Sequence, residues 1–264
     1  MKVGIVGGGV MGEAILGAAV DREVFDPQDV TVCEKLEHRR DQLRAEYGVT
    51  VTGDSDDCMG GADLVILSVK PQELGSVHGA LKPEALLLSI MAGVRISTIA
   101  EAFHHDRVVR VMPNTPVAVK AGMSVWTATS AVDSAQRELT HHLLGAIGRD
   151  LYVEDESKVD MATALSGSGP AYVFLFLEAM IEGGVSIGLT RAQAEEMALQ
   201  TVLGSALYAQ STNASPADLR GRVTSPAGTT AAALLEMERG AVRATVIDGI
   251  RAAYERAVEL GGPQ

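Results

Sequence analysis

The sequence predicts an α/β protein whose N-terminal part is a doubly wound sheet and whose C-terminal part is entirely helical. Over residues 1–153, short β-branched runs alternate with helical patterns, which is typical of strand–helix–strand units. A glycine-rich turn joins the first strand to the first helix. From residue 158 onward there is no convincing strand pattern. We therefore expect two domains, 1–154 and 155–264.

The strands of the first domain are expected at 2–6, 30–34, 49–51, 63–69, 85–90 and 107–112. Several are apolar throughout, which suits strands of a parallel sheet that are covered on both faces. Helices are expected between them at 11–20, 36–46, 54–60, 72–80 and 96–103. A strand at 122–129, a helix at 133–147 and a strand at 150–154 would complete the domain.

The second half is expected to contain four helical regions. They cover 169–188, 190–210, 215–223 and a last stretch from Thr229 to about Leu260 that breaks near Gly240. The first of them is apolar nearly all round at its start, and such a helix needs burial on every side. A chain segment of this size can hardly supply that burial alone, so we expect a homodimer.

The composition excludes several classes of protein. Acidic residues outnumber basic ones, 34 to 22, and a net charge of −12 argues against nucleic-acid binding, which needs clustered Lys and Arg. Cys33 and Cys58 form no CxxC motif and no metal-ligand spacing with histidine, so we expect no metal. No apolar run reaches the roughly 18 residues of a membrane span, and Glu13 interrupts the apolar N-terminus. A cytoplasmic protein without membrane contact is therefore expected.

The glycine-rich turn contains Gly7-x-Gly9-x-x-Gly12 between a strand and a helix. In this context the three glycines match the dinucleotide fingerprint of a Rossmann domain: a tight turn, close approach of the pyrophosphate, and helix–strand packing. The helix N-terminus also offers free N–H groups and a positive dipole end to phosphate. The alternative is a glycine-rich turn without a ligand.

Glu34 ends the second strand, 22 positions after Gly12. Its carboxylate would accept hydrogen bonds from both adenosine ribose hydroxyls, which favours NAD, and it would repel a 2′-phosphate. Lys35, Arg39 and Arg40 follow, and they could hold that phosphate if Glu34 turned away. A solvated helix face is the preferred interpretation of these cations, and the choice between NADPH and NADH stays open.

Three further loops follow strands at the edge of the sheet where ligands bind. They are "SVKPQ" at 68–72, "IMAGV" at 90–94 and "MPNTPVAV" at 112–119. Lys70 and Pro71 interrupt regular structure where the chain should pass the nicotinamide, and Ala92 and Gly93 would let a ring pack closely. Asn114 sits between two prolines and is expected to face the nicotinamide. Each loop alone is equally compatible with a simple turn.

Five motifs together resemble one enzyme family. "GIVGGGVMGEAI", "SVKPQ", "VMPNTPVAV", "ALSGSGPAYVF" and "TSPAGTTAAAL" occur in this order, and the chain is similar to pyrroline-5-carboxylate reductase over residues 2–258. The resemblance implies a Rossmann domain joined to an all-helical dimerisation and substrate-binding domain, with interleaved dimers that commonly assemble into decamers. It implies hydride transfer from NADPH or NADH to L-1-pyrroline-5-carboxylate, giving L-proline in the last step of proline biosynthesis.

The resemblance also implies site residues at the matching motif positions. Those expected to bind the cofactor are Val6, Gly7, Gly8, Gly9, Val10 and Met11 at the pyrophosphate, Ser55 near the adenosine, and Val69, Lys70, Pro71, Gln72, Met91, Ala92 and Gly93 on the nicotinamide side. Those expected to bind the substrate are Thr224, Ser225, Gly228, Thr229 and Thr230. The chain departs from the family at Glu34, where Ser, Asn or Arg is usual and NADPH is preferred, and at Ala227, where Gly is common. The second change is small and is expected to be harmless.

The start of the late helix suits a small anion. Free N–H groups there can bind the substrate carboxylate without Arg or Lys. Gly228 carries no side chain to block it, and Thr224 or Ser225 adds a hydroxyl. Thr230 is the group expected to touch the ring nitrogen. The alternative is a Ser225 N-cap followed by Pro226 at the first helical position. Since the motif holds no acid or base, catalysis is expected to come mainly from orienting imine and nicotinamide.

Two other functions remain open on the sequence. A β-hydroxyacid dehydrogenase would need a catalytic Lys on a helix of the second half, and the only Lys after position 120 is Lys158, near the domain junction. A non-catalytic NAD(P)-binding regulator would not need the Ser-Pro-Ala-Gly-Thr-Thr loop at 225–230.

Overall fold

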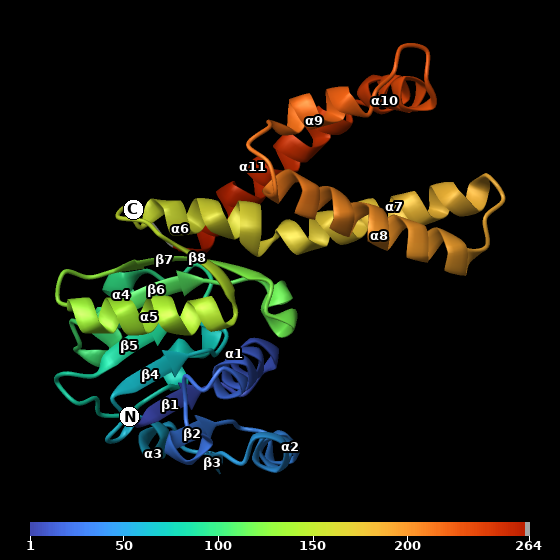
Figure 1. Ribbon diagram of the computed structural model, residues 1–264. Helices are drawn as coiled ribbons and strands as arrows, with labels where there is room; N and C mark the ends of the chain where they lie inside the picture. The colour runs from blue at the N-terminus through green and yellow to red at the C-terminus, as the bar shows by residue number, and fades with distance from the viewer. Residues whose placement is uncertain (262–264) are drawn as a thin grey trace. The chain divides into compact units, whose positions relative to one another are not determined.

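The computed structural model describes residues 1–261, and the chain forms two compact units (Figure 1). Among the described residues, the first comprises Met1–Ser168 together with residues 252–261, and the second comprises Gly169–Arg251. The chain thus leaves the first unit once and returns to it at its end. The expected second domain, 155–264, includes three residues, 262–264, that lie outside the described part.

An eight-stranded sheet forms the centre of the first unit within residues 1–261, in the order β3-β2-β1-β4-β5-β6-β7-β8. The strands are β1 Val3–Val6, β2 Val30–Cys33, β3 Thr50–Thr52, β4 Leu64–Leu67, β5 Leu86–Ser89, β6 Val108–Met112, β7 Gly122–Ala128 and β8 Gly148–Tyr152. The six predicted strands from β1 to β6 are confirmed to within two residues at each end. All are parallel, with Ile5 of β1, for example, in register with Val32 of β2 and Ile66 of β4.

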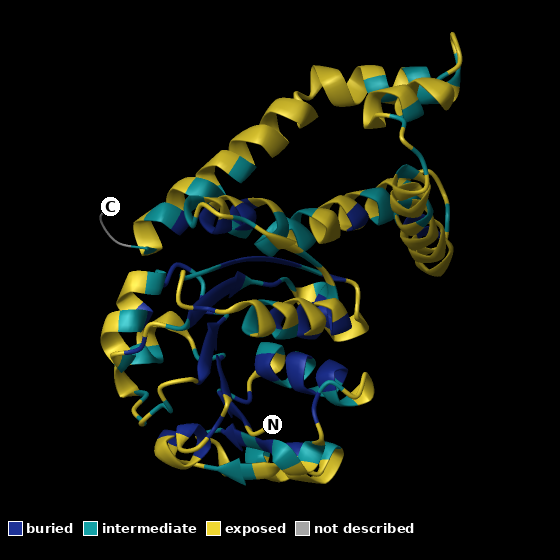
Figure 2. Cartoon of the chain, turned by 60° about the vertical axis from the view of Figure 1, so that its left-hand side comes forward, coloured by how far each residue is buried: buried dark blue, intermediate teal, exposed yellow. Residues whose placement is uncertain are grey.

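Helices pack against both faces of this sheet. They are α1 Val10–Asp21, α2 Glu37–Tyr47, α3 Ser55–Met59, α4 Ile96–Phe103, α5 Ser134–Ala146 and α6 Ser157–Ala162. Two buried clusters lie between sheet and helices; one contains Ile5, Leu16 and Trp126, and the other contains Met59, Leu67 and Ile99. Figure 2 shows the central strands as the buried layer of the unit, whereas β3 and β8 at the two edges are intermediate to exposed. Burial on both faces explains why these strands are apolar throughout.

Several short elements differ from the sequence expectation. The helix expected at 72–80 is only a 3₁₀ helix, η2 Pro71–Ser76, and the loop after β6 contains another, η3 Thr115–Val119. A third, η1 Pro27–Asp29, precedes β2. Because no helix crosses the sheet between β6 and β7, β7 returns antiparallel to β6. The sheet is therefore mixed at this end, which the sequence reasoning did not predict.

The second unit is helical throughout its described residues. Its helices are α7 Gly169–Ser186, α8 Arg191–Gln210, α9 Pro216–Arg222, α10 Thr229–Arg239 and α11 Val242–Leu260, the last of which ends in the first unit. A capping box begins α8, in which Thr190 Oγ1 accepts the Gln193 N–H. Gly240 ends α10, as the predicted break required. No strand occurs in the described residues beyond 158, so this expectation is confirmed.

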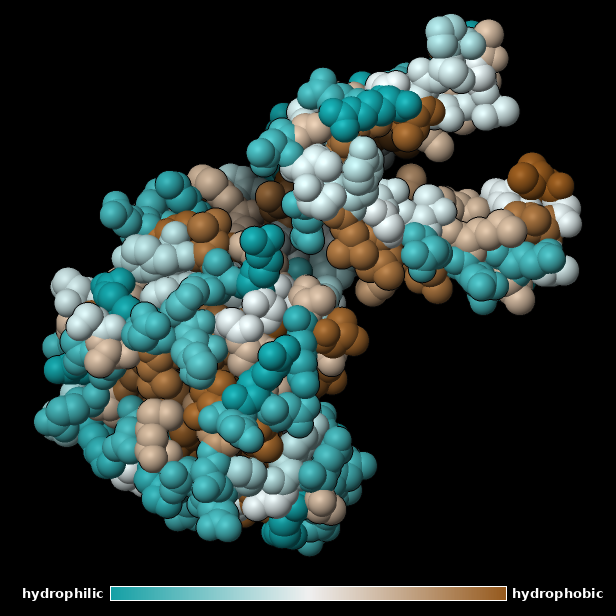
Figure 3. Space-filling model, in the orientation of Figure 1, coloured by the Kyte–Doolittle hydropathy of each residue, from teal (hydrophilic) through white to brown (hydrophobic). Residues whose placement is uncertain are grey.

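Helix α7 leaves much of its apolar surface uncovered by its own chain. Phe174 is 58% exposed and Leu175 is 67% exposed. Hydrophobic side chains reach the surface along α7 and α8 in Figure 3. The run 157–186, with a mean hydropathy of 1.3 in its most apolar window, is also long and apolar enough to cross a membrane, and only 11% of that window is buried. The expectation that no run reaches this length was wrong, because α6, the π-helical turn η4 at Thr163–Gly167 and α7 follow one another without a break.

Candidate active site

The glycine-rich turn leaves the N-terminus of α1 open. Gly7 has a left-handed φ of 108°, and its N–H donates to the Cys33 oxygen over 2.9 Å, which places the turn between β1 and β2. Gly9 is the N-cap of α1 and forms no side-chain cap, and a Cβ added there would meet nothing within 4 Å. The first N–H groups of α1 thus have no acceptor in their own helix. This geometry fits a pyrophosphate.

A cleft of about 660 Å³ lies beside this turn, at the carboxyl ends of the strands. Its lining residues are Val6, Gly7, Gly9, Cys33, Glu34, Lys35, Leu36, Gly53, Asp54, Ser55, Ser68, Val69, Lys70, Glu73, Ser76, Val77 and His78. Seven residues of the predicted cofactor set are among them: Val6, Gly7, Gly9, Glu34, Ser55, Val69 and Lys70. The volume is in the range of small-molecule and cofactor sites.

Glu34 holds the turn from the β2 side. Its Oε2 accepts the Gly8 N–H over 3.1 Å, and its Oε1 accepts the Leu36 N–H over 2.9 Å. A Cβ added at Gly8 would press on the Leu43 and Glu34 side chains. The predicted residues Val10 and Met11 form the first turn of α1, and Val10 is exposed.

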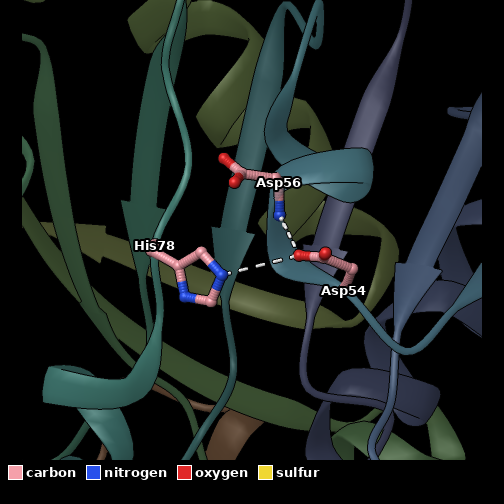
Figure 4. Close-up of side chains that lie close together, drawn as sticks. All are labelled: Asp54, Asp56 and His78. Atoms are coloured by element: carbon pink, nitrogen blue, oxygen red, sulfur yellow. Dashed lines mark hydrogen bonds and ion pairs between the residues drawn. The ribbon is translucent and has the colours of Figure 1, made fainter.

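Another part of the cleft wall is built from residues 53–55 and 76–78. Ser55 Oγ donates to the His78 oxygen over 2.6 Å and accepts the His78 N–H over 3.1 Å. Its hydroxyl therefore holds the 76–78 loop against α3. Asp54 Oδ1 caps α3 by accepting the Asp56 N–H over 3.0 Å, and His78 Nε2 lies 3.6 Å from it (Figure 4).

Within residues 1–261, Asp54, Asp56 and His78 form a group of side chains that could offer ligand atoms to one cation. All three are exposed, and the Asp54 carboxylate already serves as the helix cap. Exposed acidic groups in this arrangement do not by themselves indicate a metal site.

The residues predicted for the nicotinamide side fall into different environments. Lys70 is the N-cap of η2, and its N–H donates to Glu73 Oε2 over 3.3 Å. Pro71 and Gln72, which follow it, are exposed. Met91 is buried in the core below the sheet edge.

Gly93 lies beneath the end of α11. It has a left-handed φ of 74°, and a Cβ there would lie 3.0 Å from the Leu260 Cβ. Ala92, just before it, is half-buried. The 90–94 loop is therefore packed from the outside by the C-terminal helix.

Asn114 uses both ends of its amide inside the protein. Its Nδ2 donates to the Ser166 oxygen over 3.0 Å, and its Oδ1 accepts the Met123 N–H over 2.8 Å. It joins the loop after β6 to the π-helical turn η4. Its contact with the cofactor stays a prediction.

The predicted substrate residues lie in the second unit, around the N-terminus of α10. The Gly228 N–H donates to the Ser225 oxygen over 3.1 Å, with Pro226 second and Ala227 third in this turn. Ala227 has a left-handed φ of 58°, so the turn has the features of type II. Gly228, not Ser225, is the N-cap of α10. The alternative of a Ser225 cap with Pro226 in the first helical turn is therefore wrong.

This helix start keeps its polar groups available. Gly228 forms no side-chain cap, and a Cβ there would collide with Ser225 Oγ. Within residues 1–261, the hydroxyls of Ser225, Thr229 and Thr230 have no hydrogen-bond partner. Thr224 differs, because its hydroxyl donates to the Arg220 oxygen at the end of α9 over 2.6 Å.

Comparison with known proteins agrees with both halves of this description. A family model described as NADP oxidoreductase, coenzyme F420-dependent, matches residues 2–93, and one described as pyrroline-5-carboxylate reductase dimerisation matches residues 156–260. A pyrroline-5-carboxylate reductase of Synechocystis is 40% identical over 99% of this chain and 98% of its own. The chain belongs to the pyrroline-5-carboxylate reductase family.

Solved structures of the family have the same fold over nearly the full length. A pyrroline-5-carboxylate reductase of Coxiella burnetii matches with a TM-score of 0.90 at 35% identity, covering 99% of each chain. The Plasmodium falciparum enzyme, solved with NADP bound, matches with a TM-score of 0.90 at 28% identity, covering 99% of this chain and 98% of its own. The match to the dimerisation model over residues 156–260 supports self-association of this chain.

Sequence reasoning missed part of the cleft. Asp54, Glu73, Ser76, Val77 and His78 line it without forming a motif. A helix-capping pattern marks Asp54, an N-cap residue three positions after the predicted strand at 49–51, and this signal could have placed it at the ligand edge. The loop at 76–78 carries no such signal. Cys33 lines the cleft and Cys58 lies buried behind it, and burial raises the pKa of the Cys58 thiol to about 12, so that sulfur is not a nucleophile.

Proposed function

We propose that this protein reduces L-1-pyrroline-5-carboxylate to L-proline with NADPH or NADH, the last step of proline biosynthesis. Besides family membership, one observation supports the proposal. Helix α10 begins at an uncapped N-terminus with Gly228 as its N-cap, and the hydroxyls of Ser225, Thr229 and Thr230 beside it have no partner within residues 1–261. These are the features needed to hold a small carboxylate without a cationic side chain.

The substrate would bind at the segment that contains Thr224, Ser225, Gly228, Thr229 and Thr230. In this arrangement the first N–H groups of α10 donate to the substrate carboxylate, and the Ser225 hydroxyl adds a further donor. The Thr224 hydroxyl already donates to Arg220, so it can offer only its lone pairs. Its role is then to hold the end of α9 against the turn.

Thr230 is the proposed catalytic residue, because its unengaged hydroxyl can contact the ring nitrogen one helical residue beyond the anion site. When bound, the reduced nicotinamide supplies the hydride for the imine carbon. The protein contributes orientation, since no Asp, Glu or His belongs to the 224–230 segment that could serve as a general acid.

The two proposed domains, divided between residues 154 and 155, would have different roles. Residues 1–154 would bind the dinucleotide, with Gly7, Gly8 and Gly9 at the pyrophosphate and Glu34 and Ser55 at the adenosine. Residues 155–264 would dimerise and bind the substrate. Met91, Gly93 and Asn114 would support the nicotinamide site indirectly. Met91 is packed in the core, Gly93 is packed against Leu260, and the Asn114 amide is bonded to Ser166.

The assembly is proposed as a homodimer of interleaved helical halves that can assemble further into a decamer, in the cytoplasm. The exposed apolar surface of α7 supports a second copy as its cover. The strongly acidic chain is not proposed to bind nucleic acid, and the apolar run 157–186 is not proposed to enter a membrane.

The test is oxidation of NADH and NADPH, followed at 340 nm, with pyrroline-5-carboxylate as the second substrate. The proposal predicts turnover with product proline identified by amino-acid analysis. Turnover only with a 3-hydroxy acid and oxidised cofactor would indicate a β-hydroxyacid dehydrogenase. Tight dinucleotide binding with no turnover on either class would indicate a regulator.

A further inference from the structure

Two charged side chains hold the backbone of Gly8, one at its N–H and the other at its oxygen. Glu34 Oε2 accepts its N–H over 3.1 Å, and Arg39 Nη2 donates to its oxygen over 3.0 Å. The same Arg39 nitrogen forms a 2.7 Å ion pair with Glu13 on α1, and Nη1 donates to Gln42 over 2.8 Å. Arg39 therefore joins α2 to the glycine turn and to α1.

The other two cations of this region are engaged as well. Arg40 Nη1 donates to the main-chain oxygens of Glu34 and Lys35, both over 2.8 Å. Lys35 Nζ pairs with Glu73 Oε1 over 3.1 Å and donates to Ser76 Oγ over 3.3 Å. These three residues were expected to lie on a solvated helix face. Each of them also holds a segment of the cleft wall or of the glycine turn in place.

The cleft wall carries more negative than positive charge. Among the described residues that line it, the carboxylates are Glu34, Asp54 and Glu73, and the cations are Lys35 and Lys70. Arg39 and Arg40 are not among these lining residues. A 2′-phosphate placed here would meet the Glu34 carboxylate without a free guanidinium to offset the repulsion.

Ribose hydroxyls, unlike a 2′-phosphate, can bind the Glu34 carboxylate favourably. Each carboxylate oxygen accepts one N–H and keeps a further lone pair. A 2′-hydroxyl and a 3′-hydroxyl can donate to those lone pairs without breaking the hold on Gly8 or Leu36. The carboxylate is already fixed in position, so little ordering is needed on binding.

We propose that this protein uses NADH in preference to NADPH, with Glu34 as the specificity-determining residue and Arg39 as a positioning residue of the glycine turn. The proposal rests on the proposed function for its reaction, but it concerns only the adenosine end of the cofactor. Arg39 acts on both cofactors alike, because it touches the turn and not the ribose.

The experiment compares kcat/KM for NADH and NADPH in the wild-type protein and in Glu34→Ser. The wild type is expected to favour NADH by about tenfold or more, and the substitution is expected to lower that ratio by about tenfold, mainly through a lower KM for NADPH. A wild-type ratio near one, or a ratio unchanged by the substitution, overturns the assignment of Glu34.

Arg39→Gln tests the second half of the proposal. A positioning role predicts that kcat/KM falls by a similar factor for both cofactors, with partial rescue in Arg39→Lys and an unchanged NADH/NADPH ratio. A selective loss with NADPH would show that Arg39 binds the phosphate and would overturn the proposal. Arg44→Gln on the same helix, whose partner Asp41 is exposed, is the matched control and should change neither value.

Direct titration of NADH and NADPH by calorimetry separates this proposal from the reaction itself. If neither cofactor is oxidised with pyrroline-5-carboxylate but NADH binds about tenfold more tightly, the proposed function fails and the cofactor preference stands. Equal affinities for the two cofactors overturn the preference whatever the activity.

Discussion

Ala227 has a left-handed backbone with φ of 58°, one residue before the N-cap of α10. An L-residue with a Cβ costs roughly 1 kcal/mol in this conformation, and glycine does not. The backbone at Ala227 is therefore strained, and replacing this residue with glycine should change the stability. Ala227→Gly is expected to raise the free energy of unfolding by up to about 1 kcal/mol, measured by urea denaturation.

The same replacement inside the helix provides the control. Ala233→Gly, six residues further on at an exposed position of α10, should lower the free energy of unfolding by about 1 kcal/mol. Opposite signs for one chemical change would locate the strain at position 227. Destabilisation by both would show that the turn does not strain Ala227.

Thr230 provides a second test at the scale of one side chain. Its hydroxyl has no partner within residues 1–261, so Thr230→Val removes no internal hydrogen bond while keeping the shape. If the hydroxyl contacts the ring nitrogen as charge develops, kcat should fall by roughly tenfold or more. The Kd for NAD(P)H should stay within about twofold, since the cofactor residues belong to the other unit.

Thr201→Val is the matched control for this prediction. The Thr201 hydroxyl donates to the Met197 oxygen of its own helix α8 over 2.7 Å. Its loss should leave kcat unchanged. Unaltered steady-state kinetics in Thr230→Val would remove Thr230 from the mechanism.

At this scale the sequence indicates which residues are special but not how their atoms are used. The fingerprint glycines and Glu34 are recognisable because their spacing reflects chain geometry. The partners of Asn114 are 9 and 52 residues away, and no local pattern encodes such contacts. Ser55 was likewise predicted to lie near the adenosine. Only the structure shows that its hydroxyl donates to the His78 oxygen.

At the scale of elements, a buried ion network joins β6 to α6. Arg110 is 1% exposed; its Nη2 lies 2.5 Å from Asp160 Oδ1, and its Nη1 lies 2.8 Å from Glu156 Oε1. Glu156 Oε1 also accepts the Ile96 N–H at the start of α4 over 2.9 Å. Burying this guanidinium is tolerable only with its partners in place.

Asp160→Asn should therefore lower the free energy of unfolding by roughly 3 kcal/mol, because it leaves a buried cation with one half-buried partner. Urea denaturation measures the change. Asp248→Asn, which breaks the exposed Arg251–Asp248 pair on α11, is the control and should cost less than about 1 kcal/mol. Equal, small effects of both substitutions would contradict a structural role for the network.

A second connection, between α5 and β8, depends on pH. His141 Nδ1 lies 2.8 Å from Asp150 Oδ1, and the hydrogen bond and charge of Asp150 raise the pKa of His141 above 6.5. A pKa raised in the folded state gives stability that is fully present below the unfolded value and is lost as pH rises through the folded value. Since His141 is largely exposed, the contribution should stay below about 1 kcal/mol.

The measurement is an NMR titration of the His141 ring. Asp150→Asn should bring the pKa of His141 back toward 6.5 and should flatten the pH dependence of stability just above that value. The amide oxygen of the new side chain can still accept from Trp126 Nε1. Identical titration curves in the two proteins would show that the pair does not form in solution.

The elements themselves were largely predictable, for a physical reason. Strands β1 to β6 are short apolar runs closed by turns, and burial on both faces forces that composition. The direction of β7 was not predictable, because it depends on the absence of a crossover helix and not on the strand's own residues. Arg110 shows the same limit: a lone cation in an apolar strand signals that a partner exists, but Asp160 lies 50 residues away.

At the scale of the whole molecule, the uncovered surface of α7 is the dominant feature. Two occupants are physically possible for it, a lipid bilayer or a second copy of the chain. The run 157–186 meets the length and composition of a span. The same run overlaps the region matched by the dimerisation family model, which begins at residue 156. Self-association then accounts for an apolar helix that its own chain does not bury.

Phe174→Glu tests this choice, since Phe174 is 58% exposed within its own chain and the charge need not disturb the folding of a protomer. At a dimer interface, burying the new carboxylate should weaken association by roughly 2–4 kcal/mol, or at least about thirtyfold in Kd. Sedimentation velocity in detergent-free buffer should show a dimer or larger assembly for the wild type and monomer for the variant, with unchanged helical circular dichroism. Val119→Glu, at a 75% exposed position of the first unit, is the control and should sediment as the wild type. A wild-type protein that pellets with added vesicles, and a variant that no longer does so, would assign the surface to lipid instead.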